Sequence, residues 1–138
     1  MPLPSRVYFE NPVGRIMEHP DEYAVIQYHA GERALDCLQA FLRHTGQLLR
    51  LHGWNRLLGD QRLMSPYTPE ESQWIVEYWL AHQNQGQAVY GAVILPEDEF
   101  ARLSVNQVMQ EAQAAALTYR LFDNEAAAVA WLKQVPAA

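Results

Sequence analysis

Two short and almost uninterrupted apolar runs constrain the fold of this chain more than any other feature. They are Tyr23–Tyr28 and residues 88–95, and turn-forming residues bound them: Pro20 and Asp21 before the first run, Pro96 after the second. A strand with one face in water alternates apolar and polar residues, so a continuous apolar strand must be covered on both faces. We therefore expect both runs to lie inside a sheet that has helices packed against it.

Turn signals and hydrophobic periodicity predict the other elements. Asn-Pro and Pro-Asp turns separate the first three strands, which predicts an antiparallel meander, and right-handed β–α repeats follow it. At 138 residues the chain fits one domain. The predicted fold class is α/β: a single domain over residues 1–138, with a mixed sheet and about four helices packed on it. The predicted strands are residues 7–9, 14–18, 23–28, 56–60, 88–95 and 118–122, and the predicted helices are residues 32–52, 69–83, 97–115 and a final one capped at 123 or 124.

The junction between residues 60 and 71 carries the clearest local signal. Thr68 precedes Pro69 and lies three residues before Glu71. This spacing predicts a capping box, in which the Thr68 hydroxyl accepts from the Glu71 amide and the Glu71 carboxylate accepts from the Thr68 amide. Proline suits the first helical position, where no amide donor is needed. The second helix is therefore predicted to begin at Pro69, and Gly53 predicts where the first helix ends.

Composition argues against several classes of protein. The net charge is −6, and no basic stripe is present, which argues against a nucleic-acid partner. The apolar runs are far shorter than the roughly 20 residues that cross a bilayer, and residues 1–6 have no apolar segment of a secretory signal. The single cysteine, Cys37, cannot form an internal disulfide. These features predict a protein without a membrane span in a reducing compartment, and we expect a cytoplasmic location.

Catalytic and metal-binding patterns are missing from the sequence. The five histidines are scattered without the short spacings of zinc sites. Neither a glycine-rich phosphate loop nor a Gly-x-Ser-x-Gly elbow occurs. Cys37 lies in the middle of a predicted helix beside its apolar stripe, where a thiol is expected to be inert. The sequence therefore predicts a protein that is not an enzyme and that holds neither a cofactor nor a metal ion.

The order of elements and several junctions resemble the STAS or SpoIIAA-like group of small bacterial α/β proteins, relatives of anti-sigma-factor antagonists. The resemblance spans about residues 8–132 and implies a SpoIIAA-like fold with a regulatory or protein-binding role. One feature departs from the group: residues 60–71 contain no Asp-Ser-Ser-Gly-like phosphorylatable turn. The segments that carry the resemblance are Leu57-Leu58-Gly59-Asp60-x-Arg62, Thr68-Pro69-Glu70-x-x-x-Trp74-Ile75, Ala92-Val93-Ile94-Leu95-Pro96, and Phe122-Asp123-Asn124-Glu125-x-Ala127 with Ala130-Trp131-Leu132.

The sheet edge beyond residue 60 is the predicted functional edge, because open α/β sheets bind ligands beyond the carboxyl ends of their strands. Asp60 and Arg62 either hold a polar group of a ligand or anchor the loop. The nearby hydroxyls belong to Ser65, Thr68 and Ser72; a phosphate on Thr68 would meet helix amides, but the capping role and the adjacent glutamates argue against it. The candidate residues are Asp60, Arg62, Met64, Tyr67, Thr68, Trp74 and Tyr78.

Two functions fit this edge. The first is a protein–protein interaction or regulatory module, which the resemblance implies; it would use the loop at residues 64–67 and the aromatic second helix, and it also allows a homodimer. The second is a binder of a small apolar, lipid-like ligand. Its pocket between helices and sheet would require about 300 Å³ or more. The same side chains also fit an ordinary core. The predicted pocket residues are Trp74, Tyr78, Met64, Phe100 and Met109.

Overall fold

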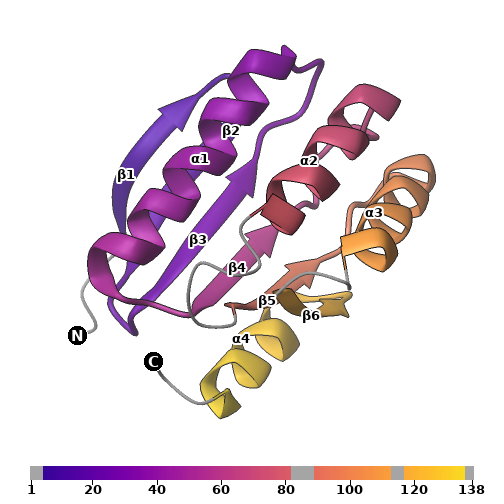
Figure 1. Ribbon diagram of the computed structural model, residues 1–138. Coiled ribbons are helices and arrows are strands. Elements are labelled where there is room, and N and C mark those ends of the chain that lie inside the picture. Colours follow the sequence, from indigo (N-terminus) through magenta and orange to yellow (C-terminus); the bar gives the residue numbers. More distant parts are fainter. Residues whose placement is uncertain (1–4, 82–88, 113–116, 136–138) are drawn as a thin grey trace.

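Three antiparallel strands begin the sheet and three parallel connections complete it, as the computed structural model shows (Figure 1). The structure describes residues 5–81, 89–112 and 117–135. The strands are β1 (Arg6–Asn11), β2 (Gly14–His19), β3 (Tyr23–Tyr28), β4 (Arg56–Asp60), β5 (Val89–Ile94) and β6 (Leu117–Phe122). The helices are α1 (Leu35–His52), α2 (Pro69–Ala81), α3 (Glu99–Ala112) and α4 (Glu125–Gln134).

The strands lie in the sheet in the same order as in the chain, from β1 to β6. The pairs β1–β2 and β2–β3 are antiparallel, and the pairs β3–β4, β4–β5 and β5–β6 are parallel. Right-handed crossovers that all advance in one direction place their helices on one face of the sheet. The helices α1, α2 and α3 accordingly share one face, and α4 covers the other (Figure 1). Because the strand order never reverses in the described sheet, it has no topological switch point of the kind that forms a ligand crevice.

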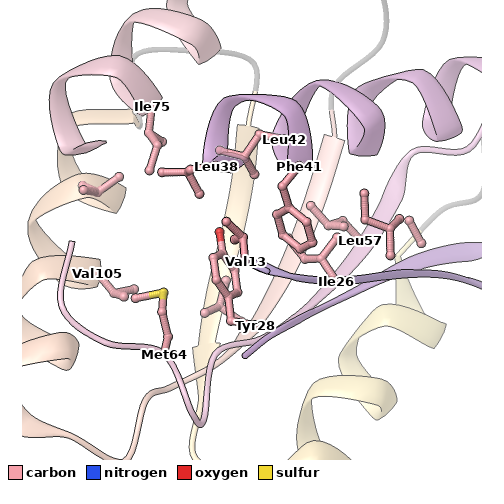
Figure 2. Packing of buried hydrophobic residues seen from close by; sticks show 14 of the residues in the cluster. Val13, Ile26, Tyr28, Leu38, Phe41, Leu42, Leu57, Met64, Ile75 and Val105 are labelled. Carbon is pink, nitrogen blue, oxygen red and sulfur yellow. The ribbon is translucent and has the colours of Figure 1, made fainter. Parts of the chain in front are cut away.

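The alternating side chains of β3 enter two separate hydrophobic cores. Ala24, Ile26 and Tyr28 belong to the larger core beneath α1, α2 and α3 (Figure 2). Tyr23 and Val25 belong to the smaller core beneath α4. Five of the six residues of β3 are buried. The continuous apolar run of β3 is therefore explained by helices on both faces, as the sequence predicted.

The predicted α/β fold class is confirmed, and the differences are confined to element ends. The helix α1 begins at Leu35 rather than at residue 32. The helix α3 begins at Glu99 because the Asp98 carboxylate accepts from the amides of Phe100 and Ala101, at 2.7 and 3.2 Å. Gly53 ends α1 in the left-handed conformation, with φ of 65°, as predicted. The predicted ends of the second and third helices, at residues 82–83 and 113–115, lie outside the described residues.

Two glycines on the helix-covered face of the sheet differ in the space around them. A Cβ on Gly14 would lie 2.3 Å from the Gln27 carbonyl oxygen, whereas a Cβ on Gly59 would have no neighbour nearer than 3.8 Å. We expect Gly14→Ala to lower the free energy of unfolding by about 2 kcal/mol or more, because β2 must move away from β3. Gly59→Ala should instead raise it by about 0.5–1 kcal/mol, since alanine loses less backbone entropy on folding. Urea denaturation of both variants measures this difference, and equal effects at the two positions would contradict it.

Candidate functional site

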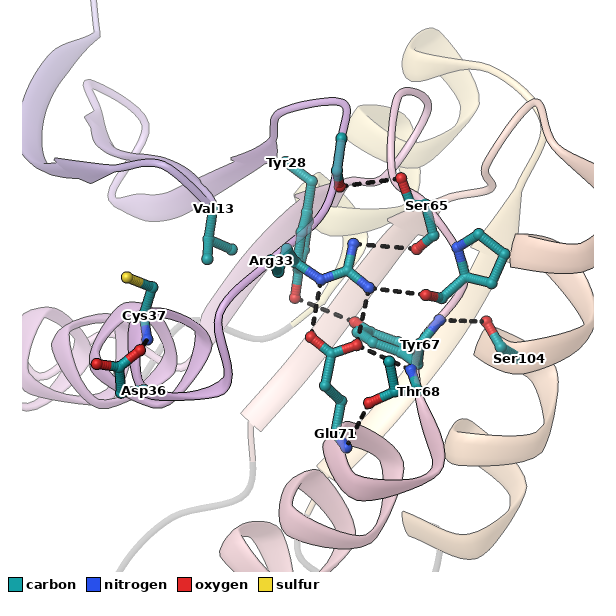
Figure 3. Close-up of polar contacts among 12 residues, drawn as sticks. Val13, Tyr28, Arg33, Asp36, Cys37, Ser65, Tyr67, Thr68, Glu71 and Ser104 are labelled. Atoms are coloured by element: carbon teal, nitrogen blue, oxygen red, sulfur yellow. Dashed lines mark hydrogen bonds and ion pairs between the residues drawn. The ribbon is translucent and has the colours of Figure 1, made fainter.

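The side chain of Arg33 holds the loop that connects β4 to α2, residues 61–68. Its guanidinium donates to the backbone carbonyls of Ser65 and Pro66, at 3.0 and 2.9 Å (Figure 3). It also forms a bidentate pair with Glu71, with both distances 3.0 Å, and its Cζ lies 5.3 Å from the centre of the Tyr67 ring. The side chains of Arg33 and Glu71 are each only 3% exposed. A buried guanidinium with these four hydrogen bonds fixes the loop in one conformation.

Glu71 joins this ion pair to the predicted capping box. Its Oε1 accepts from the Thr68 amide at 2.8 Å, and its own amide donates to the Thr68 hydroxyl at 3.1 Å. The capping box predicted from the sequence is therefore confirmed, and the Thr68 hydroxyl is already engaged. We refer to Arg33, Glu71, Thr68 and the two loop carbonyls as the Arg33 network. It connects the segment before α1 with the start of α2.

Electrostatics within this region follow from burial and pairing. Burial opposes the charge on Arg33, but hydrogen bonds and charge from Glu71 outweigh that effect and raise the Arg33 pKa. The hydroxyls of Tyr28 and Tyr67 lie 3.1 Å apart, and burial raises the pKa of both groups. Both phenols therefore remain neutral at physiological pH. The region contains a compensated ion pair and two neutral hydroxyls.

Asp60 and Arg62 bind each other at the end of β4. The guanidinium of Arg62 donates to both oxygens of Asp60, at 3.0 and 2.8 Å, and its backbone amide donates to Oδ1 at 3.2 Å. Gln27 donates to the other oxygen at 3.4 Å. Burial raises the Asp60 pKa, but the hydrogen bonds from Arg62 outweigh it and lower the pKa below its ordinary value. Of the two roles left open by the sequence, this geometry favours anchoring of the loop.

Two predicted edge residues lie in the interior. Met64 is 1% exposed and packs near Val105 of α3 (Figure 2), and Tyr67 is 8% exposed. The expectation that both contribute to an exposed loop surface is wrong. The loop is attached to α3 at two points, so it lies against that helix: the Glu97 amide donates to the Arg62 carbonyl, and the Tyr67 amide donates to the Ser104 hydroxyl. Met64 thereby enters the larger core, while the adjacent Leu63 is exposed.

Trp74 and Tyr78 lie between α2 and α1. Their rings stack with centroids 5.0 Å apart, and the Arg43 guanidinium of α1 lies 5.7 Å from the Trp74 ring centre. Trp74 also packs against the larger core and is half-buried. These two aromatic residues therefore connect the two helices, at some distance from Asp60 and Arg62. The structure does not bring the seven candidate residues into one site.

A small cavity lies in the larger core between the helices and the sheet. Its volume is about 50 Å³, and its lining comes from α1, α2, α3 and the strands β3 to β6. Two glycines, Gly59 and Gly91, form part of its floor, and Gln61, Tyr28 and Tyr67 are its polar lining. Of the five residues predicted to line a ligand pocket, Met109 lines this cavity, whereas Phe100 is 74% exposed. The volume is well below that of pockets for lipid-like ligands.

A larger groove lies on the outer side of the helix pair formed by α2 and α3. It has a volume of about 450 Å³ and extends from Tyr67 and Pro69 along both helices to Glu77 and Glu111. Next to it, at the start of α3, Phe100 and Leu103 are 74% and 67% exposed. Leu63 is 57% exposed on the loop that is hydrogen-bonded to the same part of α3. We refer to Leu63, Phe100 and Leu103 as the apolar cluster.

Comparisons with known proteins do not assign this chain to a family. Neither the family models, the curated proteins nor the solved structures give a significant match. Within the described residues, no three or more His, Cys, Asp or Glu side chains are grouped closely enough to hold a metal ion. No described helix combines the length and the apolar character that a bilayer crossing requires. The local geometry is therefore the basis for any functional assignment.

Sequence analysis did not identify Arg33, Tyr28 or Gln61 as site residues. Arg33 pairs with a residue 38 positions away, and no periodic or local pattern reports such a distance. Tyr28 appeared only as the end of a buried strand. One signal was available for Glu71, since its place in the capping box predicted that its carboxylate would turn back toward residue 68. The second partner of that carboxylate depends on tertiary structure.

The Arg33–Glu71 pair gives a direct test of the Arg33 network. Glu71→Gln preserves the shape and the capping acceptor but leaves the guanidinium buried without its carboxylate. We expect the free energy of unfolding to fall by about 3–5 kcal/mol. Glu70→Gln is the matched control, because Glu70 lies in the same helical turn and is exposed. Denaturant midpoints measure both effects, and equal midpoints for the two variants would show that the network is not a major source of stability.

The lowered pKa of Asp60 predicts a pH-dependent contribution to stability. The carboxylate is ionised more readily in the folded chain, so its contribution is fully present above about pH 4 and is lost as pH falls through the folded-state pKa. The difference in unfolding free energy between wild type and Asp60→Asn should therefore shrink as the solution is acidified. Denaturant unfolding across this pH range measures it. Asp123→Asn, whose side chain is 77% exposed, serves as the control; a pH-independent difference for Asp60→Asn would refute the assignment.

Proposed function

We propose that this protein is a non-catalytic interaction module of the SpoIIAA-like type, which binds a basic amphipathic helix of a partner protein in the groove between α2 and α3. The groove carries the proposal. The helices α2 and α3 follow successive parallel strands, so they run side by side in the same direction (Figure 1). At 1.5 Å per residue, their 13 and 14 residues form a groove about 20 Å long. This shape suits helix-in-groove recognition.

The apolar cluster supports a partner with an apolar face. Phe100, Gln107 and Glu111 are spaced by seven and four residues, so they lie on one face of α3. Gln107 and Glu111 line the groove, and Phe100 extends that face toward the start of the helix. Exposed phenylalanine and leucine side chains grouped beside a groove are characteristic of a binding surface. A partner helix in the groove would cover them.

The charges indicate what kind of helix fits. The charged side chains that line the groove are Glu77 and Glu111, both acidic. The whole chain carries a net charge of −6. A partner segment with Lys or Arg beside its apolar residues is therefore complementary, whereas a second copy of this chain would bring like charge. The sequence resemblance to SpoIIAA-like proteins supports the same functional class, and a single cysteine supports a cytoplasmic setting.

A lipid-like ligand has weaker support. The internal cavity of about 50 Å³ is far smaller than the roughly 300 Å³ that such a ligand requires. The residues that sequence analysis assigned to a ligand pocket are distributed among the core, the α1–α2 contact and the exposed apolar cluster. The outer groove is larger, but polar side chains such as Ser72, Gln73 and Gln107 form much of its lining. This composition suits a peptide better than an acyl chain.

Site-specific photo-crosslinking in cells tests the proposal. A photoreactive residue at Gln107 lies in the groove, and one at Leu51, which is 66% exposed on α1, is the control. We expect a crosslink from position 107 to a segment with apolar residues at helical spacing and flanking Lys or Arg, and none from position 51. Crosslinks to a second copy of the chain, or equal capture from both positions, would refute the proposal.

The captured segment, made as a peptide, then measures the contribution of the apolar cluster. Phe100→Asp removes an exposed apolar contact and should weaken peptide binding by about tenfold or more. Leu51→Asp makes the same chemical change on another face and should leave the affinity unchanged. Because both side chains are mostly exposed, neither variant should unfold the protein. Equal affinities of the two variants would place the peptide elsewhere.

A further inference from the structure

We infer that the cavity beneath α2 is a binding site for a small neutral molecule with an apolar body and one hydrogen-bond donor, the size of a short-chain alcohol. This site lies on the inner side of the helix pair and is independent of the outer groove. Its polar end is Gln61, which is 3% exposed and whose Oε1 accepts no hydrogen bond from the described residues. A buried acceptor of this kind is normally satisfied in folded proteins.

The floor of the cavity shows that its space is not a requirement of packing. Gly59 of β4 and Gly91 of β5 contribute no side chains to the face beneath α2. A Cβ on Gly59 would make ordinary contacts with Ile26 and Val93, at 3.8 and 3.9 Å. The backbone of α2 approaches those of α1 and α3 more closely than those of the strands. The glycine floor and the raised helix together leave room in an otherwise filled core.

The walls and the polar end determine the chemistry of the ligand. Apolar side chains such as Leu42, Ile75 and Met109 form most of the lining. The Gln61 amide nitrogen donates to the Tyr67 hydroxyl at 3.5 Å, and this contact turns Oε1 away as the open acceptor. The Tyr67 hydroxyl pairs in turn with that of Tyr28. A ligand hydroxyl that donates to Gln61 Oε1 therefore completes this hydrogen-bonded group.

Size and polarity separate such a ligand from the alternatives. A volume of about 50 Å³ holds several waters, since one water occupies roughly 10–15 Å³ by the same measure. Each buried water needs two to four polar partners, roughly, and the apolar walls do not provide them. A drug-sized or lipid-like molecule needs about 300 Å³ or more. A molecule with a few heavy atoms and one donor fits both the volume and the single open acceptor.

Two probes that differ in hydrogen bonding test the site by methyl NMR. Ethanol carries a donor, and xenon is an apolar probe without one. We expect ethanol, titrated through the millimolar range, to shift the methyl resonances of Ile75, Leu42 and Met109 with saturation, because such small ligands bind weakly. Xenon should shift the same methyl groups. Linear, unsaturated shifts spread over the surface would overturn the inference, as would unaltered water-to-methyl contacts that show an adventitious hydration site only.

Two variants separate the cavity from its polar end. Gln61→Met keeps an unbranched side chain of similar length and removes the acceptor, so ethanol should bind about tenfold more weakly while xenon binding changes less than about twofold. Gly59→Ala adds a methyl group to the floor and should weaken the binding of both probes. Its expected gain in stability ensures a folded protein. Unchanged ethanol affinity in either variant would refute the assignment.

Discussion

The buried guanidinium of Arg33 is the interaction on which the arrangement of the helices depends. It lies between three segments that are distant in the sequence: the loop before α1, the loop after β4 and the first turn of α2 (Figure 3). Taking a charge out of water is costly unless every donor finds an acceptor. The carboxylate of Glu71 and the carbonyls of Ser65 and Pro66 supply these acceptors. The loop can adopt only conformations that keep all of them in place.

This constraint has a consequence for α2, whose backbone lies closer to α1 and α3 than to the strands. A helix that does not rest directly on the sheet needs another means of positioning, and the Arg33 network provides it at the N-terminus. The sequential strand order places α3 beside α2 on the same face. The two helices then present a groove to solvent and leave a small cavity toward the glycine floor. Both features follow from one strand order and one ion pair.

The sequence predicts elements whose signals are local. The continuous apolar run of β3 predicted burial on both faces, Gly53 predicted the end of α1, and Thr68 with Glu71 predicted the capping box that begins α2. Each of these signals involves residues within a few positions of one another. The pairing of Arg33 with Glu71 has no such signal. A charged residue in a loop is usually exposed, and only the packed fold brings the two side chains together.

Prediction of the candidate site failed for a related reason. Strands and helices have a period that separates buried from exposed positions, but a loop has none. In the loop after β4, Leu63 is exposed and Met64 is buried, although the sequence offers no basis for this order. The choice is made by the two hydrogen bonds that hold the loop against α3, through Arg62 and Tyr67. The exposed surface of this edge is therefore formed by Leu63 and α3 and not by the aromatic residues of α2, because those are already in contact with α1 and the core.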